Sequence, residues 1–371
     1  MRPTFAEINL SNLILNYENI ARHIGKSINI MPVVKADAYG HGMINCVEAL
    51  LKAKPKPHFF AVALLEEAFE FRKKFKSERI LVFGKINEPY FKKIIEYNIT
   101  PTFYELDLIE KYNRICKEFN TKGKFHLKID TGMGRVGIDI KYLDDFVQLI
   151  RRCRHVNLEG VYTHFANSDS KDKSFSYEQL KKFNYAIGLI KQEIKNVRYF
   201  HCANSGAIID IPESYFNFVR PGISLYGYYP SDETSRSIPL KPVMSIKTKL
   251  IYLKWVEKGT SISYGRTYIT ERRTQIGTLP LGYADGYNRL LSNKGKVIFN
   301  NKLFNVAGRV TMDQIMVNFE DENVTYDDEI IVLGSSENVK FDASDISKVI
   351  NTIPYEVCTS ISKRVKRKYV Y

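Results

Sequence analysis

The sequence predicts an α/β protein of two domains: an N-terminal (β/α)8 barrel of the TIM type, followed by a mostly antiparallel C-terminal β domain. Three observations predict this fold class. The first two-thirds of the chain alternates short apolar runs with amphipathic stretches, and the last third is strand-like. The chain has 371 residues, and a single core stops growing near ~250–300 residues. We expect the barrel to occupy residues 1–235 and the β domain to occupy residues 236–371.

Eight apolar runs are the strand candidates of the predicted barrel. Near-continuous apolar strands that alternate with helices are typical of a parallel sheet buried on both faces. Eight strand–helix units fit a closed barrel better than an open sheet. The runs begin at Ile28, His58, Arg79, Ile99, Lys124, Val156, Val197 and Phe216.

Helices are predicted where apolar residues recur three and four positions apart. One such stripe follows Gly42, a second lies within residues 143–150, and a longer helix is predicted over residues 176–195. The stripe after Gly42 consists of Met43, Cys46, Val47, Leu50 and Leu51.

From Met244 onward, apolar runs separated by turn signals predict the strands of the β domain. One short helix is predicted over residues 343–350. The polar, proline-containing stretch at residues 229–241 is predicted to join the two domains.

Composition excludes several classes of protein. The chain carries 55 Lys and Arg against 41 Asp and Glu, a net charge of +14, but most of the cations are interleaved with acids. This pattern favours a solvated surface over a nucleic-acid site, and the one dense basic run is residues 363–368. No apolar stretch reaches the ~20 residues of a membrane span, and no export signal is recognised. The five scattered cysteines predict buried free thiols, no metal site and a cytoplasmic location.

Lys35 is the first candidate catalytic residue. It follows the apolar run at residues 31–34, and functional residues of a (β/α)8 barrel lie at the C-terminal ends of strands. A lysine buried in a barrel mouth has a lowered pKa and a nucleophilic amine, as a Schiff-base lysine needs. The dense block at residues 34–42, VKADAYGHG, distinguishes Lys35 from an ordinary surface lysine.

This block resembles the pyridoxal-phosphate attachment motif of alanine racemases. Eight further segments resemble motifs of that family, in the same order and at compatible spacing over nearly the whole chain. They are residues 128–137 (KIDTGMGRVG), 161–166 (VYTHFA), 201–205 (HCANS), 219–223 (VRPGI), 263–265 (SYG), 282–289 (GYADGYNR), 308–314 (GRVTMDQ) and 354–355 (PY). The resemblance implies a homodimer in which each subunit joins a barrel to a β domain.

The activity that the resemblance implies is racemisation of alanine, supplying D-alanine for peptidoglycan. The α-proton must leave one face of the substrate and return to the other, so two acid/base groups are needed. Pyridoxal 5'-phosphate is the implied cofactor, because it delocalises the charge left on the α-carbon. Lys35 would be one base, and Tyr264 of the partner subunit would be the other. Tyr264 needs a partner that favours its phenolate, and the resemblance offers His164 and Arg289.

By the same resemblance, Arg220 faces the pyridine nitrogen of the cofactor. Arginine does not give up its proton, so the nitrogen would stay unprotonated and would withdraw electrons weakly. Phosphate contacts are expected after the seventh and eighth strands, as in other barrels of this type. The expected cofactor-binding residues are Lys35, Tyr39, His164, Asn204, Ser205, Arg220, Gly222, Ile223 and Tyr355.

Contacts to the substrate are implied in the same way. The guanidinium fork of Arg135 would hold the substrate carboxylate, with Met312 and Asp313 as further substrate-binding residues. Lys128 is expected to be carbamylated, and the alternative is an unmodified lysine paired with Asp130.

An access corridor is implied as well, whose bulky side chains would favour alanine over larger amino acids. One residue departs from the family pattern, because Thr311 stands where many members have cysteine. The corridor residues are Tyr283, Arg289, Arg309 and Tyr355.

Two other functions stay open at this point. A pyridoxal-phosphate decarboxylase of the same two-domain fold would carry an acidic residue at the pyridine nitrogen and a catalytic cysteine, so Arg220 disfavours it. A non-catalytic pyridoxal-phosphate-binding carrier would resemble the barrel alone, so the β domain and Tyr264 disfavour it.

Overall fold

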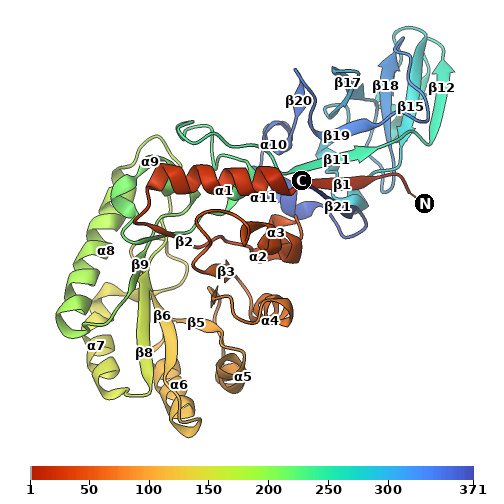
Figure 1. Ribbon diagram of the computed structural model, residues 1–371. Helices are drawn as coiled ribbons and strands as arrows, with labels where there is room; N and C mark the ends of the chain where they lie inside the picture. The colour runs from red at the N-terminus through yellow and green to blue at the C-terminus, as the bar shows by residue number, and fades with distance from the viewer. Residues whose placement is uncertain (1) are drawn as a thin grey trace.

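A computed structural model of the chain describes residues 2–371, which form two parts (Figure 1). One part is a curled parallel sheet with helices on its outer side, and the other is a mostly antiparallel sheet. Helix α1 (Leu10–Ile24) lies along the first part and points toward the second. Within residues 2–371, no helix combines the length and the apolar character needed to cross a bilayer.

All eight predicted strands of the first part are present and pair in parallel. One ladder runs in the order β3-β4-β5-β6-β8-β9, and β2 pairs with β10 separately. A bridge between Val33 and Ala61 connects the β2 side to β3, and the Arg220 N–H donates to the Ala203 carbonyl beside β9 at 3.0 Å. The regular ladders describe a curled half-barrel and do not by themselves confirm the predicted closed barrel. The strands are β2 (Asn29–Ile30), β3 (Phe60–Val62), β4 (Ile80–Val82), β5 (Thr100–Phe103), β6 (Gly123–Asp130), β7 (Ile138–Asp139, paired with β6), β8 (Val156–Tyr162), β9 (Tyr199–His201) and β10 (Phe218–Val219).

Helices follow the strands and bury the faces that their sequence patterns predict. In α3, four residues of the stripe after Gly42 are buried, and the fifth, Leu51, caps the helix. The helices predicted over residues 143–150 and 176–195 are α7 and α8, each displaced by no more than two residues. Besides α1, the helices of this part are α2 (Lys35–Tyr39), α3 (Met43–Leu50), α4 (Leu65–Lys74), α5 (Phe91–Glu96), α6 (Leu106–Glu118), α7 (Leu143–Arg152), α8 (Ser174–Glu193) and α9 (Ser205–Asp210).

The second part is built on a sheet with the strand order β12-β15-β18-β17-β16-β19-β11-β1-β21. Its pairs are antiparallel except for β1 and β21, which run parallel. The helix predicted over residues 343–350 has those bounds, because Asp342 caps it by accepting from the backbone N–H groups of Ser344 and Asp345. The elements are β11 (Met244–Thr248), β12 (Tyr252–Val256), β13 (Ser261–Ile262), β14 (Tyr268–Ile269), β15 (Thr274–Leu279), β16 (Lys296–Phe299), β17 (Lys302–Val306), β18 (Ile315–Glu320), β19 (Ile330–Ser335), β20 (Lys340–Phe341), α10 (Ala343–Ile350), α11 (Pro354–Ser360) and β21 (Lys366–Val370).

Strand β1 (Phe5–Asn9) was not expected from the sequence. It precedes α1 in the chain but lies in the sheet of the second part, between β11 and β21. Its burial alternates along the strand, with Ala6 and Ile8 fully buried. The first residues of the chain therefore connect the two parts.

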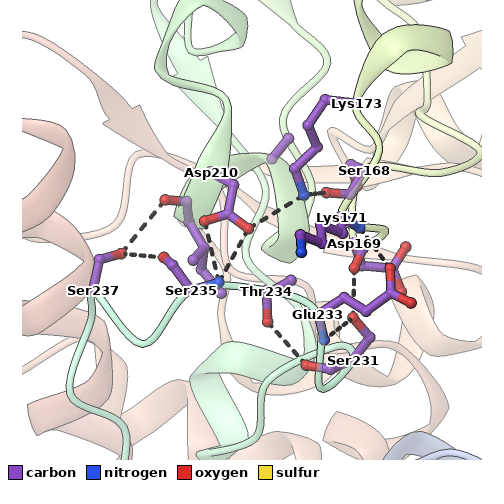
Figure 2. Close-up of polar contacts among 12 residues, drawn as sticks. Ser168, Asp169, Lys171, Lys173, Asp210, Ser231, Glu233, Thr234, Ser235 and Ser237 are labelled. Carbon is purple, nitrogen blue, oxygen red and sulfur yellow. Dashed lines mark hydrogen bonds and ion pairs between the residues drawn. The ribbon is translucent and has the colours of Figure 1, made fainter.

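The stretch at residues 229–241 is anchored rather than free. Ser231 Oγ donates to the carbonyl of Asp169, and the Ser235 N–H donates to the carboxylate of Asp210 at 3.3 Å (Figure 2). Lys173 forms an ion pair with the same carboxylate, also at 3.3 Å, and donates to the carbonyl of Ser168. Polar residues of the predicted linker thus bind it to the loop after β8 and to the last residue of α9.

The basic run at residues 363–368 is less solvated than its composition predicts. Its last three residues belong to β21, and Arg367 is half-buried. Arg367 donates to four carbonyl oxygens, including that of Gly40 in the first part at 3.0 Å. Lys368 lies over the ring of Phe5. Part of the positive charge therefore connects the end of the chain to the rest of the protein.

All five cysteines are buried with free thiols, as their scattered spacing predicts. Burial raises the pKa of the Cys46 and Cys202 thiols, which keeps them protonated and unreactive. Across residues 2–371, no group of three or more His, Cys, Asp or Glu side chains is arranged to hold a metal ion.

Asn16 of α1 gives a test of how the two parts are connected. Its amide donates to the carbonyls of Leu225 and Lys241 and accepts from the Lys241 N–H at 2.8 Å. Asn16→Ala leaves these buried backbone groups unpaired, so the free energy of unfolding should fall by about 3 kcal/mol. Asn12→Ala is the matched control on the same helix. It removes one side-chain bond, to Pro242 O, and should cost about 1 kcal/mol. Equal losses in chemical denaturation would contradict this account.

Candidate active site

A cavity of about 630 Å³ opens at the C-terminal ends of the parallel strands of the first part. Lys35 follows β2, Lys85 follows β4, Tyr104 follows β5, His164 follows β8 and Ser205 follows β9. Enzymes built on parallel barrels carry their active sites at this end. The strands thus position the candidate residues by topology rather than by closeness in sequence.

Eleven of the predicted site residues line this cavity together. They come from segments spread over most of the chain, and only the fold brings them into contact with one space. They are Lys35, Tyr39, Lys128, Arg135, His164, Asn204, Ser205, Arg220, Gly222, Ile223 and Tyr355.

The cavity is lined by five cationic side chains and by no carboxylate. Burial and the nearby charge of Arg135 lower the pKa of Lys35, against an opposing effect of Glu67. Burial, followed by the charge of Arg220, lowers the pKa of Lys128 to about 8. Such a concave cluster of positive charge attracts anions, and both amines lose their protons more readily than a surface lysine does. The cations are Lys35, Lys85, Lys128, Arg135 and Arg220.

The turn after Lys35 has a left-handed backbone. Residues 36–39 have φ between +52° and +55°, a conformation that costs residues with a Cβ about 1–2 kcal/mol each. The Met43 N–H donates to Asp37 Oδ1 at 2.7 Å, and the Gly40 N–H donates to the Ala36 carbonyl at 2.9 Å. These bonds hold the turn in place, and it brings both Lys35 and Tyr39 to the cavity.

Lys128 lies on β6 and is buried, with its Nζ donating to the carbonyl of Val136 at 2.9 Å. The ion pair with Asp130 that we considered from the sequence is wrong, since none joins the two side chains among the described residues. The Asp130 carboxylate instead accepts from the backbone N–H groups of Gly132 and Gly134. It thereby shapes the loop that carries Arg135, and its charge favours the protonated form of Lys128 only from beyond ion-pair distance.

Arg220 is buried, and every group that accepts a hydrogen bond from it is neutral. Its guanidinium donates to His201 Nδ1 at 2.7 Å and to the carbonyls of Thr163 and Cys202 at 2.8 and 3.1 Å. His164 Nδ1 lies 3.3 Å away, and burial and Arg220 hold the pKa of His164 well below its usual value. Burial lowers the pKa of Arg220 to about 10, so it remains a cation at neutral pH.

A cradle suited to a phosphate group lies between β9 and β10. Ser205 Oγ accepts from the Gly222 N–H at 3.0 Å and contacts Ser224 Oγ at the same distance. A Cβ on Gly222 would lie 2.6 Å from the Tyr39 hydroxyl, so only glycine leaves this space open. The Tyr39 and Tyr355 rings lie side by side, 6.0 Å apart. Hydroxyls and exposed backbone N–H groups are the donors that bind phosphate.

The other six predicted residues line a different cavity, of about 420 Å³, in the second part. Tyr264 lies there with 73% of its surface exposed, and Met312 with 53%. Of the two partners expected for Tyr264, Arg289 shares this cavity and His164 lies in the first one. One chain therefore does not bring Lys35 and Tyr264 into the same cavity. The six residues are Tyr264, Tyr283, Arg289, Arg309, Met312 and Asp313.

Several residues of the first cavity were not expected from the sequence. Tyr162 lies inside the segment 161–166, where the motif resemblance gave a role to His164 alone. Phe83, Lys85 and Tyr104 directly follow strands β4 and β5. The rule that barrel sites lie at strand ends would have found them.

Comparison with known proteins follows the same two-part division. A family model described as "Alanine racemase, N-terminal domain" matches residues 8–230, and "Alanine racemase, C-terminal domain" matches residues 243–369. The curated protein "Alanine racemase 2" of Caldanaerobacter subterraneus subsp. tengcongensis is 41% identical over 373 positions, covering 100% of this chain and 96% of that protein.

Solved structures are similar over the same length. An alanine racemase from Clostridium difficile 630 superposes with a TM-score of 0.92 at 38% identity, covering 100% of this chain and 96% of that one. The alanine racemase of Bartonella henselae with covalently bound pyridoxal phosphate superposes with a TM-score of 0.89 at 28% identity, covering 100% of both chains.

Gly222→Ala tests the cradle between β9 and β10. The added Cβ collides with the Tyr39 hydroxyl, so the variant should bind pyridoxal phosphate at least about ten-fold more weakly, a loss of about 1.4 kcal/mol. Absorbance titration of the cofactor-free protein measures this affinity. Gly188→Ala is the control, because a Cβ there meets nothing within 4 Å in helix α8. Unchanged affinity in the Gly222 variant would show that the cradle does not hold the phosphate.

Proposed function

The chain belongs to the alanine racemase family, and from that premise we propose that it interconverts L- and D-alanine with pyridoxal 5'-phosphate by a two-base mechanism. The observation that carries the proposal is the first cavity, where five cations and no carboxylate surround Lys35. A ligand that enters this cavity must bring negative charge, and a cofactor phosphate and a substrate carboxylate both do so.

The residues of the cavity fit the cofactor. Lys35 would hold it covalently, since its lowered pKa favours the nucleophilic amine. Tyr39, Ser205, Gly222, Ile223 and Tyr355 would hold its phosphate, and Arg220 would face its ring nitrogen, near His164 and Asn204. When bound, pyridoxal phosphate stabilises negative charge on the substrate α-carbon.

The second base comes, in this proposal, from the partner subunit of a homodimer. Tyr264 lies exposed in a separate cavity with Met312 and Asp313, so a single chain has the base but no substrate site beside it. Placing that cavity of one protomer over the Lys35 cavity of the other would complete the site. Tyr283, Arg289 and Arg309 would then line the corridor to it.

Two proton movements complete the reaction. Tyr264 of the partner subunit removes the α-proton of L-alanine through its phenolic oxygen, and Lys35 Nζ returns a proton to the opposite face. For D-alanine the two groups exchange roles. Arg135 holds the substrate carboxylate, and its fixed orientation keeps the α-carbon between the two bases.

Arg220 and the second part distinguish this function from the two alternatives. The decarboxylase alternative needs an acidic group at the ring nitrogen, but no carboxylate lines the cavity. The carrier alternative lacks the second part, which here matches the racemase C-terminal family model over residues 243–369. Both are therefore set aside.

Several broader features belong to the same proposal. Hydrogen bonds from β2 to β3 and from β10 to β9 support closure of the eight strands into a barrel. The proposed domain division is 1–235 and 236–371, with β1 of the N-terminal segment crossing into the sheet of the second part. D-alanine supply to peptidoglycan is the proposed cellular role, and the cytoplasmic location stays a prediction.

Mixing two inactive variants tests the shared site. Lys35→Ala lacks the residue that anchors the cofactor, and Tyr264→Phe lacks the second base, so each homodimer should be inactive. Exchange of subunits should restore part of the racemase activity, because a heterodimer carries both defects in one site and leaves the other intact. Polarimetry with L-alanine measures the recovery. Absence of recovery, once mass spectrometry shows that heterodimers have formed, would contradict a site made by two subunits.

Arg220→Glu tests the role of the buried guanidinium. A carboxylic acid there would protonate the ring nitrogen, strengthen electron withdrawal and prolong the charge on the α-carbon. Racemisation should slow, with each ten-fold loss corresponding to about 1.4 kcal/mol. Pyruvate should also appear, since the delayed proton can return to the cofactor instead. Arg198→Glu, an exposed site with the same charge change, should do neither. A cofactor-loaded Arg220→Glu enzyme that racemises normally without pyruvate would refute the assignment.

The pKa of Lys128 predicts pH-dependent carbamylation. Its neutral amine adds to carbon dioxide, forming a nitrogen–carbon bond and releasing a proton. Because the pKa is lowered to about 8, raising the pH from about 7 to about 9 should increase the modification. Carbon-13 NMR with labelled bicarbonate detects the carbamate, and Lys128→Met should remove the signal. A signal that persists in Lys128→Met would place the modification elsewhere.

A further inference from the structure

A chain of four buried polar side chains runs from Arg220 into the interior of the barrel. His201 ends β9, His126 lies on β6 and Glu159 lies on β8. Arg220, His201, His126 and Glu159 are all at most 3% exposed. The last three do not line the cavity, so they act on a ligand only through Arg220.

The donor properties of arginine determine where the protons of this chain lie. A guanidinium can only donate, so His201 Nδ1, 2.7 Å from Arg220 Nη1, must be an unprotonated acceptor. The proton of neutral His201 is then on Nε2, which lies 2.9 Å from His126 Nδ1. That bond needs one donor and one acceptor, so His126 carries its own proton on Nε2.

Glu159 stands at the end of this sequence of bonds. Its Oε2 lies 3.8 Å from His126 Nε2, an electrostatic contact longer than a direct hydrogen bond. No hydrogen bond joins His126 Nε2 to this carboxylate among the described residues. The carboxylate is instead balanced by ion pairs to Oε1, from Arg79 at 2.5 Å and from Lys124 at 4.0 Å. Burial raises the pKa of Glu159, but His126 and Arg79 outweigh this effect and lower it to about 2, so the carboxylate is charged.

The surrounding residues prevent the two imidazoles from turning. Tyr162 stacks on His201 with ring centroids 4.8 Å apart and planes 7° apart. Gly160 makes room for His126, since a Cβ there would lie 2.6 Å from the ring. Phe59 and Tyr199 also contact the His126 ring. Rings that cannot rotate exchange the roles of their nitrogens only by moving protons.

We propose that Glu159 and His126 are positioning residues for the racemase reaction. The Glu159 carboxylate selects the Nε2–H form of His126, which selects the Nε2–H form of His201, and His201 Nδ1 then orients the Arg220 guanidinium toward the cavity. A carboxylate in direct contact with Arg220 would also orient it but would cancel its charge. The relay through two neutral imidazoles orients the cation and leaves its charge for the ring nitrogen. This inference rests on the role proposed above for Arg220.

The proton positions can be measured without the cofactor. Nitrogen-15 NMR of histidine-labelled, cofactor-free protein distinguishes the two neutral forms and the cation of each imidazole, with signals assigned by single substitutions among the seven histidines. We expect His126 and His201 both to be neutral and protonated on Nε2 at neutral pH. In the protein without substitutions, detection of either ring as a cation or as the Nδ1–H form would overturn the proposal.

Glu159→Gln tests whether the Glu159 carboxylate determines which nitrogen of His126 carries the proton. An amide can donate to His126 Nε2, so His126 should populate the Nδ1–H form and its bond to His201 should weaken. In the cofactor-loaded enzyme, kcat should fall about ten-fold, and KM for alanine should stay unchanged because Arg135 still holds the carboxylate. Glu159→Asp keeps the charge and should recover part of the loss.

The control is Asp342→Asn, which removes a carboxylate of similar burial that caps helix α10. It should lower stability without moving the histidine signals or kcat. If Glu159→Gln leaves the His126 signal unchanged, or lowers kcat no more than Asp342→Asn, the positioning role is refuted. If Arg220→Glu alters the reaction and Glu159→Gln does not, this inference fails while the proposed function stands. If neither substitution alters the reaction, the proposed role of Arg220 is wrong, and the inference that rests on it is wrong as well.

Discussion

Positive charge at the C-terminal ends of the parallel strands is the constraint on which the rest of the structure depends. Five cations converge there without a carboxylate in the cavity lining, and within the described residues Lys85 alone among them forms an ion pair, with Glu105. Removing a charge from water without a partner is costly. The fold meets this cost with neutral acceptors, such as the Val136 carbonyl for Lys128 and three acceptors for Arg220. The positive charge of the cavity therefore stays available to attract a ligand with several negative groups. Burial and this same charge lower the pKa values of Lys35 and Lys128.

The backbone around Lys35 adopts an unfavourable conformation to hold the Lys35 side chain at the cavity. Four residues with a Cβ take the left-handed conformation in succession, and nothing local favours this. The turn persists because Asp37 binds the Met43 backbone at the start of α3 and because Gly40 lies against the carbonyl of Cys358 in α11. An element of the second part therefore packs on the turn that presents Lys35. The two parts share in shaping the first cavity even within one chain.

Apolar periodicity was sufficient to predict the strands of the first part and helix α10, since both depend on patterns within a few residues. It could not predict β1, because the partners of that strand lie at residues 244–248 and 366–370. The left-handed turn ran against local preference and was missed for that reason. Motif resemblance identified eleven of the residues that line the cavity but none of those behind it. Glu159 and His126 carried a signal that was not used, since an acid and an imidazole in strands buried on both faces require partners.

The position of β1 has a consequence for synthesis of the protein on the ribosome. Translation proceeds at roughly 5–20 residues per second, so β1 leaves the ribosome long before either of its neighbours exists. The parallel sheet of the first part is complete while β1 is still an unpaired edge, exposed to other nascent chains. Only when residues 366–370 emerge does the parallel pair with β21 form. The slowest contacts of this fold thus join the two ends of the polypeptide, and a stalled or truncated chain would expose β1 as a site of aggregation.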